Sequence, residues 1–167
     1  MQVSATGRRI IEAFEGCEKA MSNGMYAPYY DFRMVLKQGY GHTNLWGIPP
    51  RVTPGVYWTR EQCGRALDND LRVVEKRVNK LLAGAILTQS QFDGLVSFDF
   101  EDENLVSSTI PAKMLSGDVA GAIAILLQYD ALDGEKLARL SWRRKCEAEL
   151  LRGNIDMSLS LNQIKGP

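Results

Sequence analysis

Two acidic side chains, Glu15 and Asp31, flank a stretch rich in tyrosine and phenylalanine near the start of the chain. Glycoside hydrolysis uses such a pair. One carboxyl group gives its proton to the leaving oxygen, and the other, ionised, activates a water or attacks the sugar. Aromatic rings add an apolar surface on which a sugar can lie. The residue types therefore suggest carbohydrate cleavage, although scattered acids and a tyrosine-built core would give the same local pattern.

The two carboxylates fall in elements of different kinds. Glu15 lies near the end of a predicted amphipathic helix, which Gly16 loosens. From residue 26 to about 58, aromatics, glycines and prolines replace the helical period, and we expect β structure only in this region, which contains Asp31. The apolar positions that recur at helical spacing in the first element are Ile10, Phe14, Cys17 and Met21.

The rest of the chain is predicted to be helical. Capping boxes, "TREQ" at 59–62 and "TQSQ" at 88–91, begin two helices. Asp118 caps "VAGAIAILLQY", which is apolar on nearly every side and predicts the buried central helix. A helix over "SWRRKCEAELL" closes this part, so the predicted class is α+β and mostly helical.

The length of 167 residues suits a single domain. We expect a small β-hairpin lobe over about 16–58, a connecting helix over about 59–83, and a helical lobe over about 84–153 that includes the first helix. The polar segment 154–167 is expected to be loosely attached.

Composition argues against several classes of function. Twenty Lys and Arg balance twenty Asp and Glu, which argues against nucleic acid as a partner. Three separated cysteines, Cys17, Cys63 and Cys146, predict free thiols, and with His42 the only histidine we expect no metal and no cofactor. We find no secretion signal and no apolar run of about 18 residues, so we expect no membrane segment.

The order of several blocks resembles a known family. The blocks "FEG", "YYD", "GYGHT", "LTQSQFDGLVSFDF" and "RLSWRRKCEAELL" lie in this order within residues 4–153. In this they are similar to the phage-type lysozymes of glycoside hydrolase family 24, which are endolysin muramidases. The resemblance implies a two-lobed lysozyme-like fold with a cleft. It also implies cleavage of the β-1,4 bond between N-acetylmuramic acid and N-acetylglucosamine in peptidoglycan.

The resemblance also implies residue roles. Glu15 in "FEG" matches the family's general acid, and Asp31 matches its second carboxylate, which orients the attacking water because most members invert the anomeric centre. Arg143 matches the arginine that lies against the catalytic glutamate, and Arg144 is the other candidate for that role. His42 in "GYGHT" is expected to serve structure by tying the turn to the small lobe.

Three residues near these acids are candidates for lining the sugar groove, with plain packing as the alternative for each: Tyr30, Tyr40 and Gly41.

Two residues depart from the family pattern beside Asp31. The usual run is close to "DxxGxxTIGYGHT", whereas this chain reads "DFRMVLKQGYGHT". Met34 thus replaces a hairpin glycine, and Lys37 replaces the threonine that helps Asp31 hold the water. If Lys37 points toward the acids, its charge lowers the pKa of Glu15 or Asp31 and turnover falls. If it extends outward, the acids are undisturbed.

A third departure is acidic. The run "SFDFEDENL" brings together Asp99, Glu101, Asp102 and Glu103 where relatives often read "SFAFNVGxGNL". A solvated turn is the commoner meaning of such a run, and a rebuilt groove is the alternative.

These features leave several functions open. The first is an active muramidase of a phage or prophage, an endolysin that acts as a monomer on glycan strands. The second is a catalytically impaired descendant that binds glycan or a protein partner. The third is a transglycosylase-like variant, because a sugar hydroxyl can capture an intermediate when the water is not held. A nucleic-acid module, suggested only by "WRRK", is remote.

Access to the wall is implied by the resemblance alone. We expect synthesis in the host bacterial cytoplasm and action on the periplasmic cell wall after release, which requires a holin or lysis.

Overall fold

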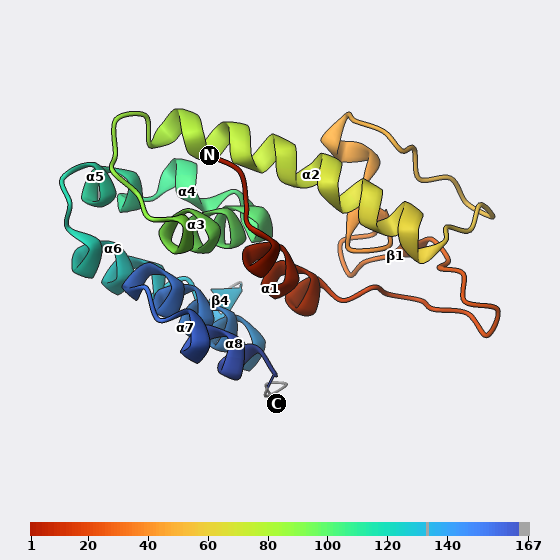
Figure 1. Ribbon diagram of the computed structural model, residues 1–167. Helices are drawn as coiled ribbons and strands as arrows, with labels where there is room; N and C mark the ends of the chain where they lie inside the picture. The colour runs from red at the N-terminus through yellow and green to blue at the C-terminus, as the bar shows by residue number, and fades with distance from the viewer. Residues whose placement is uncertain (133, 164–167) are drawn as a thin grey trace. The chain divides into compact units, whose positions relative to one another are not determined.

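The computed structural model describes residues 1–132 and 134–163. These residues form mostly helices, with one antiparallel sheet of three strands and one of two (Figure 1). The predicted class, α+β and mostly helical, is confirmed. The helices are α1 (Ala5–Glu15), α2 (Arg60–Leu81), α3 (Gln89–Asp102), α4 (Asn104–Ser107), α5 (Ile110–Leu115), α6 (Val119–Leu126), α7 (Ala138–Arg152) and α8 (Ile155–Gln163), with a 3-10 turn η1 (Asn44–Trp46).

The chain forms two compact units. Residues 15–73 make one, which we call the hairpin unit, and residues 1–14 with the chain from Val74 onward make the other, which we call the helical unit. Helix α2 contributes its first part to the hairpin unit and its last part to the helical unit.

The hairpin unit contains the larger sheet. Strands β1 (Tyr29–Tyr30), β2 (Leu36–Gln38) and β3 (His42–Thr43) are antiparallel in the order β1-β2-β3. The turn between β2 and β3 requires glycine at Gly39, where φ is +64° and a Cβ atom would lie 2.9 Å from the Cβ of Cys63. This turn therefore packs directly on α2.

Both predicted capping boxes form. The Thr59 N–H donates to Gln62 Oε1 at 2.7 Å, and the Gln62 N–H donates to Thr59 Oγ1 at 3.2 Å, so the first turn of α2 is closed. Thr88 and Gln91 make the same reciprocal pair at the start of α3. Local sequence therefore determines where both helices begin.

Helix α3 is the buried centre of the helical unit. Residues 92–100 are all buried. The prediction that α6 fills this role is wrong, because α6 buries only one face through Ala122, Ile123 and Leu126 while Ala120 and Ala124 are exposed. Small alanines make α6 apolar all round without the bulk that a central helix needs.

The buried polar groups of α3 attach other segments to it. Asp93 accepts a hydrogen bond from the Ser4 N–H at 2.9 Å, and Asp99 Oδ2 pairs with Arg77 Nε at 2.6 Å. Ser97 donates to Glu147 Oε1 at 2.7 Å. The residues before α1, the end of α2, and α7 are thus all fixed to α3.

A second, small sheet was not expected. Strands β4 (Ala131–Leu132) and β5 (Glu135–Lys136) pair antiparallel in the helical unit. The prediction that β structure is confined to residues 26–58 is therefore wrong. The available signal was the dipeptide Asp133-Gly134, which is typical of tight hairpins.

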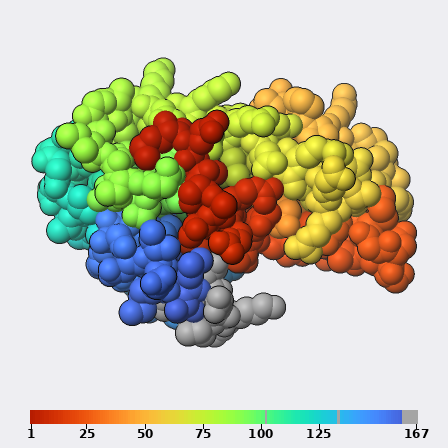
Figure 2. Space-filling view, viewed as in Figure 1, coloured from red at the N-terminus to blue at the C-terminus, as the bar shows by residue number. Residues whose placement is uncertain are grey.

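The segment after α7 is attached, not loose, in its described part. Residues 155–163 form α8, and the Ser158 hydroxyl, fully buried, donates to the Cys146 carbonyl at 3.0 Å. Helices α7 and α8 lie side by side in the helical unit (Figure 1), and Figure 2 shows this last part of the chain as a blue surface. The expectation of a loose tail is wrong for this part, and residues 164–167 lie outside the described residues.

Candidate active site

Glu15 is the last residue of α1. Gly16 follows with φ +64°, a left-handed conformation that ends helices, so Cys17 and Met21 lie beyond the helix that their spacing predicts. Glu15 is partly buried, and its Oε2 lies 3.7 Å from where a Cβ atom on Gly41 would be. The carboxylate therefore faces the turn between β2 and β3.

Asp31 closes the loop between β1 and β2. Its N–H donates to the Val35 carbonyl and its carbonyl accepts from the Met34 N–H, both at 3.0 Å. Its Oδ1 accepts the N–H groups of Arg33 and Val35, each at 2.9 Å. This side-chain turn fixes one edge of the carboxylate to the backbone.

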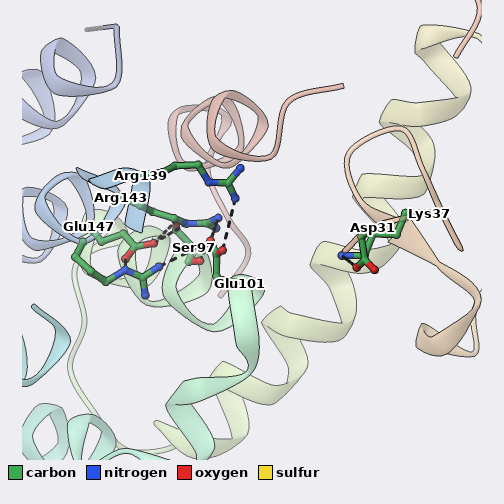
Figure 3. A network of polar contacts seen from close by, with 8 residues as sticks. Asp31, Lys37, Ser97, Glu101, Arg139, Arg143 and Glu147 are labelled. Atoms are coloured by element: carbon green, nitrogen blue, oxygen red, sulfur yellow. Dashed lines mark hydrogen bonds and ion pairs between the residues drawn. The ribbon is translucent and has the colours of Figure 1, made fainter. Parts of the chain in front are cut away.

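Lys37 occupies the other edge. Tyr29 and Lys37 are directly opposed in the β1–β2 pair, so their side chains share a face with Asp31. The Lys37 Nζ lies 3.0 Å from Asp31 Oδ2 (Figure 3). Of the two orientations considered from the sequence, the lysine therefore adopts the one directed at Asp31.

The surroundings of Asp31 favour its ionised form. Desolvation raises its pKa, but the hydrogen bonds from the Val35 N–H and from Lys37 outweigh this, and the pKa lies below its ordinary value. Asp31 is thus a carboxylate, not a carboxylic acid, at neutral pH.

The Tyr29 phenol lies close enough to both acids to feel their charges. Burial raises its pKa to about 12, together with the negative charges of Glu18, Glu15 and Asp31. The charges of both candidate carboxylates therefore contribute to the raised pKa of this phenol, after burial and Glu18. Sequence reasoning missed Tyr29, although strand alternation places it on the same face as Asp31.

His42 is buried and engaged on both ring nitrogens. Its Nδ1 lies 2.7 Å from Asp70 Oδ1, and its Nε2 lies 2.7 Å from the Pro50 carbonyl oxygen. Since a carbonyl only accepts, Nε2 carries a hydrogen, and the Nδ1–Asp70 pair shares a further proton. These contacts join β3 to α2 and to the loop before it.

The three candidates for the groove differ in exposure. The Tyr30 side chain is 58% exposed, whereas Tyr40 is 5% exposed and lies in the core. Packing is therefore the favoured interpretation for Tyr40. Gly41 has φ +85° beside Glu15, which a residue with a Cβ adopts only with strain.

Arg143 lies in a buried charge cluster of the helical unit (Figure 3). Its Nε donates to Glu147 Oε1 at 3.1 Å, its Nη2 donates to the Ser97 carbonyl at 2.8 Å, and its Nη1 donates to Glu101. The guanidinium also covers the ring of Phe14, 5.4 Å from the centroid. Contact of Arg143 with Glu15 stays a prediction.

Arg144, the other candidate, joins the same cluster through Nε, which lies 3.0 Å from Glu147 Oε2.

The acidic run is a solvated turn only in part, because Glu103 is exposed at the end of α3 whereas two other members are held by arginines. Asp99 is buried and paired with Arg77, and Glu101 is paired with Arg143. Burial raises the pKa of Glu101, but its arginine neighbours outweigh this and hold it below the ordinary value. The side chain of Asp102 lies outside the described part.

Neither a metal site nor a membrane-spanning helix is found among the described residues. Within residues 1–132 and 134–163, no group of three or more His, Cys, Asp or Glu side chains is arranged to hold a metal ion. Among the helices of the same residues, none combines the length and the apolar character that crossing a bilayer requires.

Comparison with known proteins gives consistent matches. A sequence model of the phage lysozyme family matches residues 12–147. The SAR-endolysin of Bacteriophage PS34 is 29% identical over 127 residues, which are 75% of this chain and 72% of that protein.

Solved structures share the fold. The muramidase domain of SpmX from Asticaccaulis excentricus superposes with a TM-score of 0.75 at 28% identity, over 90% of this chain and 97% of that one. The active form of the P1 phage endolysin Lyz gives a TM-score of 0.75 at 20% identity, over 93% and 87% of the two chains. The predicted lysozyme-like fold is confirmed by these likenesses.

Proposed function

The chain belongs to the phage lysozyme family, and from that premise we propose that it is a peptidoglycan-degrading muramidase of the endolysin type. We further propose that it hydrolyses the β-1,4 bond between N-acetylmuramic acid and N-acetylglucosamine. The observation that supports this most is the pair of carboxylates in the hairpin unit: Glu15 faces the glycine turn, and Asp31 is fixed in the loop between β1 and β2.

In the proposed mechanism, Glu15 is the general acid. Its proton passes to the glycosidic oxygen while the bond from that oxygen to the anomeric carbon breaks. Positive charge develops on the sugar ring, and a water oxygen attacks the opposite face. Asp31 orients that water and takes its proton, so the product is a reducing sugar of inverted configuration.

Lys37 limits how Asp31 can hold the water. Its ammonium occupies the Oδ2 edge at 3.0 Å, and two backbone N–H groups occupy Oδ1. An ammonium only donates, so Lys37 can bind a water through its oxygen but cannot accept its proton. Proton removal therefore falls to Asp31 alone, whose lowered pKa makes it a weaker base.

The same ion pair favours a second candidate function, a protein that binds glycan without cleaving it. Loss of the hydroxyl that would position water weakens hydrolysis more than binding. A transglycosylase-like outcome lies between the two, because a sugar hydroxyl then replaces water at the anomeric carbon.

Turbidity loss by permeabilised Gram-negative cells tests the proposal. We expect the wild type to clear the suspension and Glu15→Gln to reduce clearing by at least about 100-fold, the scale of a lost general acid. The matched control is Glu18→Gln, which neutralises a nearby exposed carboxylate that also acts on Tyr29 and should leave clearing within about twofold. Equal clearing by wild type and Glu15→Gln contradicts the mechanism.

Product analysis separates the alternatives. Hydrolysis adds one water to each muropeptide cut, whereas internal cyclisation leaves anhydro ends of lower mass. A wild type that sediments with sacculi but releases nothing supports the binding function instead.

We also propose, from the family alone, that the protein acts as a monomer on glycan strands in the periplasm. It would reach them from the host cytoplasm after a holin or lysis opens the way.

A further inference from the structure

The loop between β1 and β2 contains an unusual residue for its backbone. Residues 32–34 connect Asp31 to Val35, and we call them the hairpin tip. Met34 has φ +59° at the position of such loops that glycine normally fills. A residue with a Cβ atom is unfavourable in this conformation, so Met34 destabilises the loop relative to glycine.

Packing within the protein does not offset the unfavourable backbone conformation of Met34. Met34 is 73% exposed and Phe32 is 74% exposed. Neither side chain therefore contributes to the core of the hairpin unit. Strain retained by an exposed apolar residue points to a contact with something outside the chain.

The tip is ordered by its neighbours. The Arg33 guanidinium lies 5.2 Å from the centroid of the Phe32 ring, a cation–π contact that orients the ring. The Arg33 N–H donates to Asp31 Oδ1 at 2.9 Å. The tip and the Asp31 carboxylate are therefore parts of one turn, and a ligand at Asp31 lies beside the tip.

We propose that the hairpin tip is a glycan-binding subsite continuous with Asp31. The Phe32 ring stacks on a pyranose face, Met34 contacts an apolar edge of the sugar such as the N-acetyl methyl group, and Arg33 donates to sugar oxygens. This inference rests on the proposed function, because it takes the occupant to be the glycan strand that Asp31 acts on.

Continuity with Asp31 favours a glycan over a membrane surface as the occupant. Residues 15–73 contain seven Lys and Arg against six Asp and Glu, and an excess of one positive charge is too small to hold the hairpin unit on anionic lipid.

Co-sedimentation with purified peptidoglycan sacculi tests the subsite. All variants are made in a Glu15→Gln background, so that binding is measured without cleavage. We expect Phe32→Ala to weaken sacculus binding by about three- to tenfold, as for a lost aromatic contact. The matched control is Leu45→Ala, since Leu45 is 78% exposed in the same unit and lies outside the tip. It should bind as the background does.

Met34→Gly gives a readout that misfolding cannot imitate. Glycine relieves the left-handed strain, so we expect the melting temperature to rise by about 2 to 4 °C. The same substitution should weaken sacculus binding severalfold. A variant that is more stable yet binds less tightly assigns the methionine to the ligand.

Several results would overturn the subsite. These are unchanged sacculus binding by both tip variants, or no binding by the background protein. Another is a result in which the tip variants bind sacculi normally but lose binding to vesicles of phosphatidylethanolamine and phosphatidylglycerol. The occupant of the tip would then be a membrane. The test is independent of catalysis. If the wild type clears no cells but Phe32→Ala still weakens sacculus binding, the subsite stands and the proposed hydrolysis fails.

Discussion

Asp31 is the residue of the candidate site whose position and ionisation are both fixed by its contacts. Two backbone N–H groups and Lys37 contact its oxygens, and the pKa stays below the ordinary carboxyl range despite desolvation. Because the folded pKa is lower than the unfolded one, these contacts stabilise the fold above about pH 4. That stability is lost as the pH falls through the folded pKa.

Lys37→Thr should move the acidic limb of the activity profile. Without the ammonium, the pKa of Asp31 rises toward its ordinary value, so kcat/KM begins to fall at a higher pH than in the wild type. Near neutral pH, we expect turnover to increase severalfold, because Asp31 becomes a stronger base and a hydroxyl can fix the water. Rates of sacculus solubilisation between pH 3 and 8 measure both effects.

The control for this prediction is Lys76→Thr, which removes an exposed lysine from the part of α2 in the helical unit. Its acidic limb should coincide with that of the wild type. An unmoved acidic limb in Lys37→Thr would mean that Asp31 does not set it. A stability change should not imitate the shift, since a partly exposed ion pair of this kind contributes about 1 kcal/mol or less.

The sequence predicts part of the candidate site, and its catalytic roles stay predictions, whereas other features of the site could not be predicted. Glu15 and Asp31 followed from residue type and block order. The direction of the Lys37 side chain could not be predicted, because a long flexible side chain can point toward Asp31 or away from it. The strand register, which places Lys37 opposite Tyr29, is known only from the structure. Tyr29 lies in the "YYD" block, but its nearness to both acids depends on burial, which the sequence does not reveal.

At the scale of elements, a buried pair joins the sheet of the hairpin unit to α2. His42 on β3 and Asp70 on α2 are 0% and 1% exposed, with 2.7 Å between Nδ1 and Oδ1. Burial raises the pKa of Asp70, and His42 opposes that rise. The strands here are only two or three residues long, so this attachment, more than the ladder, should hold the sheet.

His42→Ala should therefore destabilise the protein by about 3 to 5 kcal/mol, because it leaves a buried carboxyl group without its partner. The pKa of Asp70 then rises further, and a raised folded pKa makes stability fall as the pH rises above the unfolded value. We expect the loss relative to wild type to be smaller at pH 4 than at pH 7. Urea unfolding at both pH values measures it.

The double variant His42→Ala with Asp70→Asn serves as control, since it lacks the carboxyl group. Its deficit should not vary between these pH values. A pH-independent deficit in the single variant would show that Asp70 is not the titrating partner.

Elements with local signals were predictable, and elements defined by their neighbours were not. Thr59 and Thr88 predict where α2 and α3 begin, because all residues of a capping box lie within four consecutive positions. Whether α3 or α6 is the central helix depends on which of the two is surrounded by other helices. A count of apolar residues does not reveal this, since α3 buries Asp93, Ser97 and Asp99 among its partners.

At the scale of the whole molecule, the two units differ in how they are held. The helical unit is built around α3, in which residues 92–100 are all buried. The hairpin unit relies on short strands and long connections, and most of residues 53–61 are exposed. Regions with fewer buried contacts open at lower free energy. The hairpin unit should therefore unfold first.

Two buried thiols can report this order. Cys63 lies in the hairpin unit and Cys146 in the helical unit, and both are 0% exposed. A hydrogen bond with Cys17 and burial raise the pKa of Cys63, and burial raises that of Cys146 to about 12. Because the thiolate is the reactive form, neither should be alkylated in the native protein at pH 8.

In a Cys17→Ser background each unit retains a single reporter. We expect alkylation of Cys63, followed by mass spectrometry, to begin at a lower urea concentration than that of Cys146, since the hairpin unit has the smaller core. Leu95→Ala, which opens a cavity in α3, should move the Cys146 transition to lower urea more than the Cys63 transition. Coincident transitions in both proteins would mean that α2, which contributes to both units, makes them unfold as one.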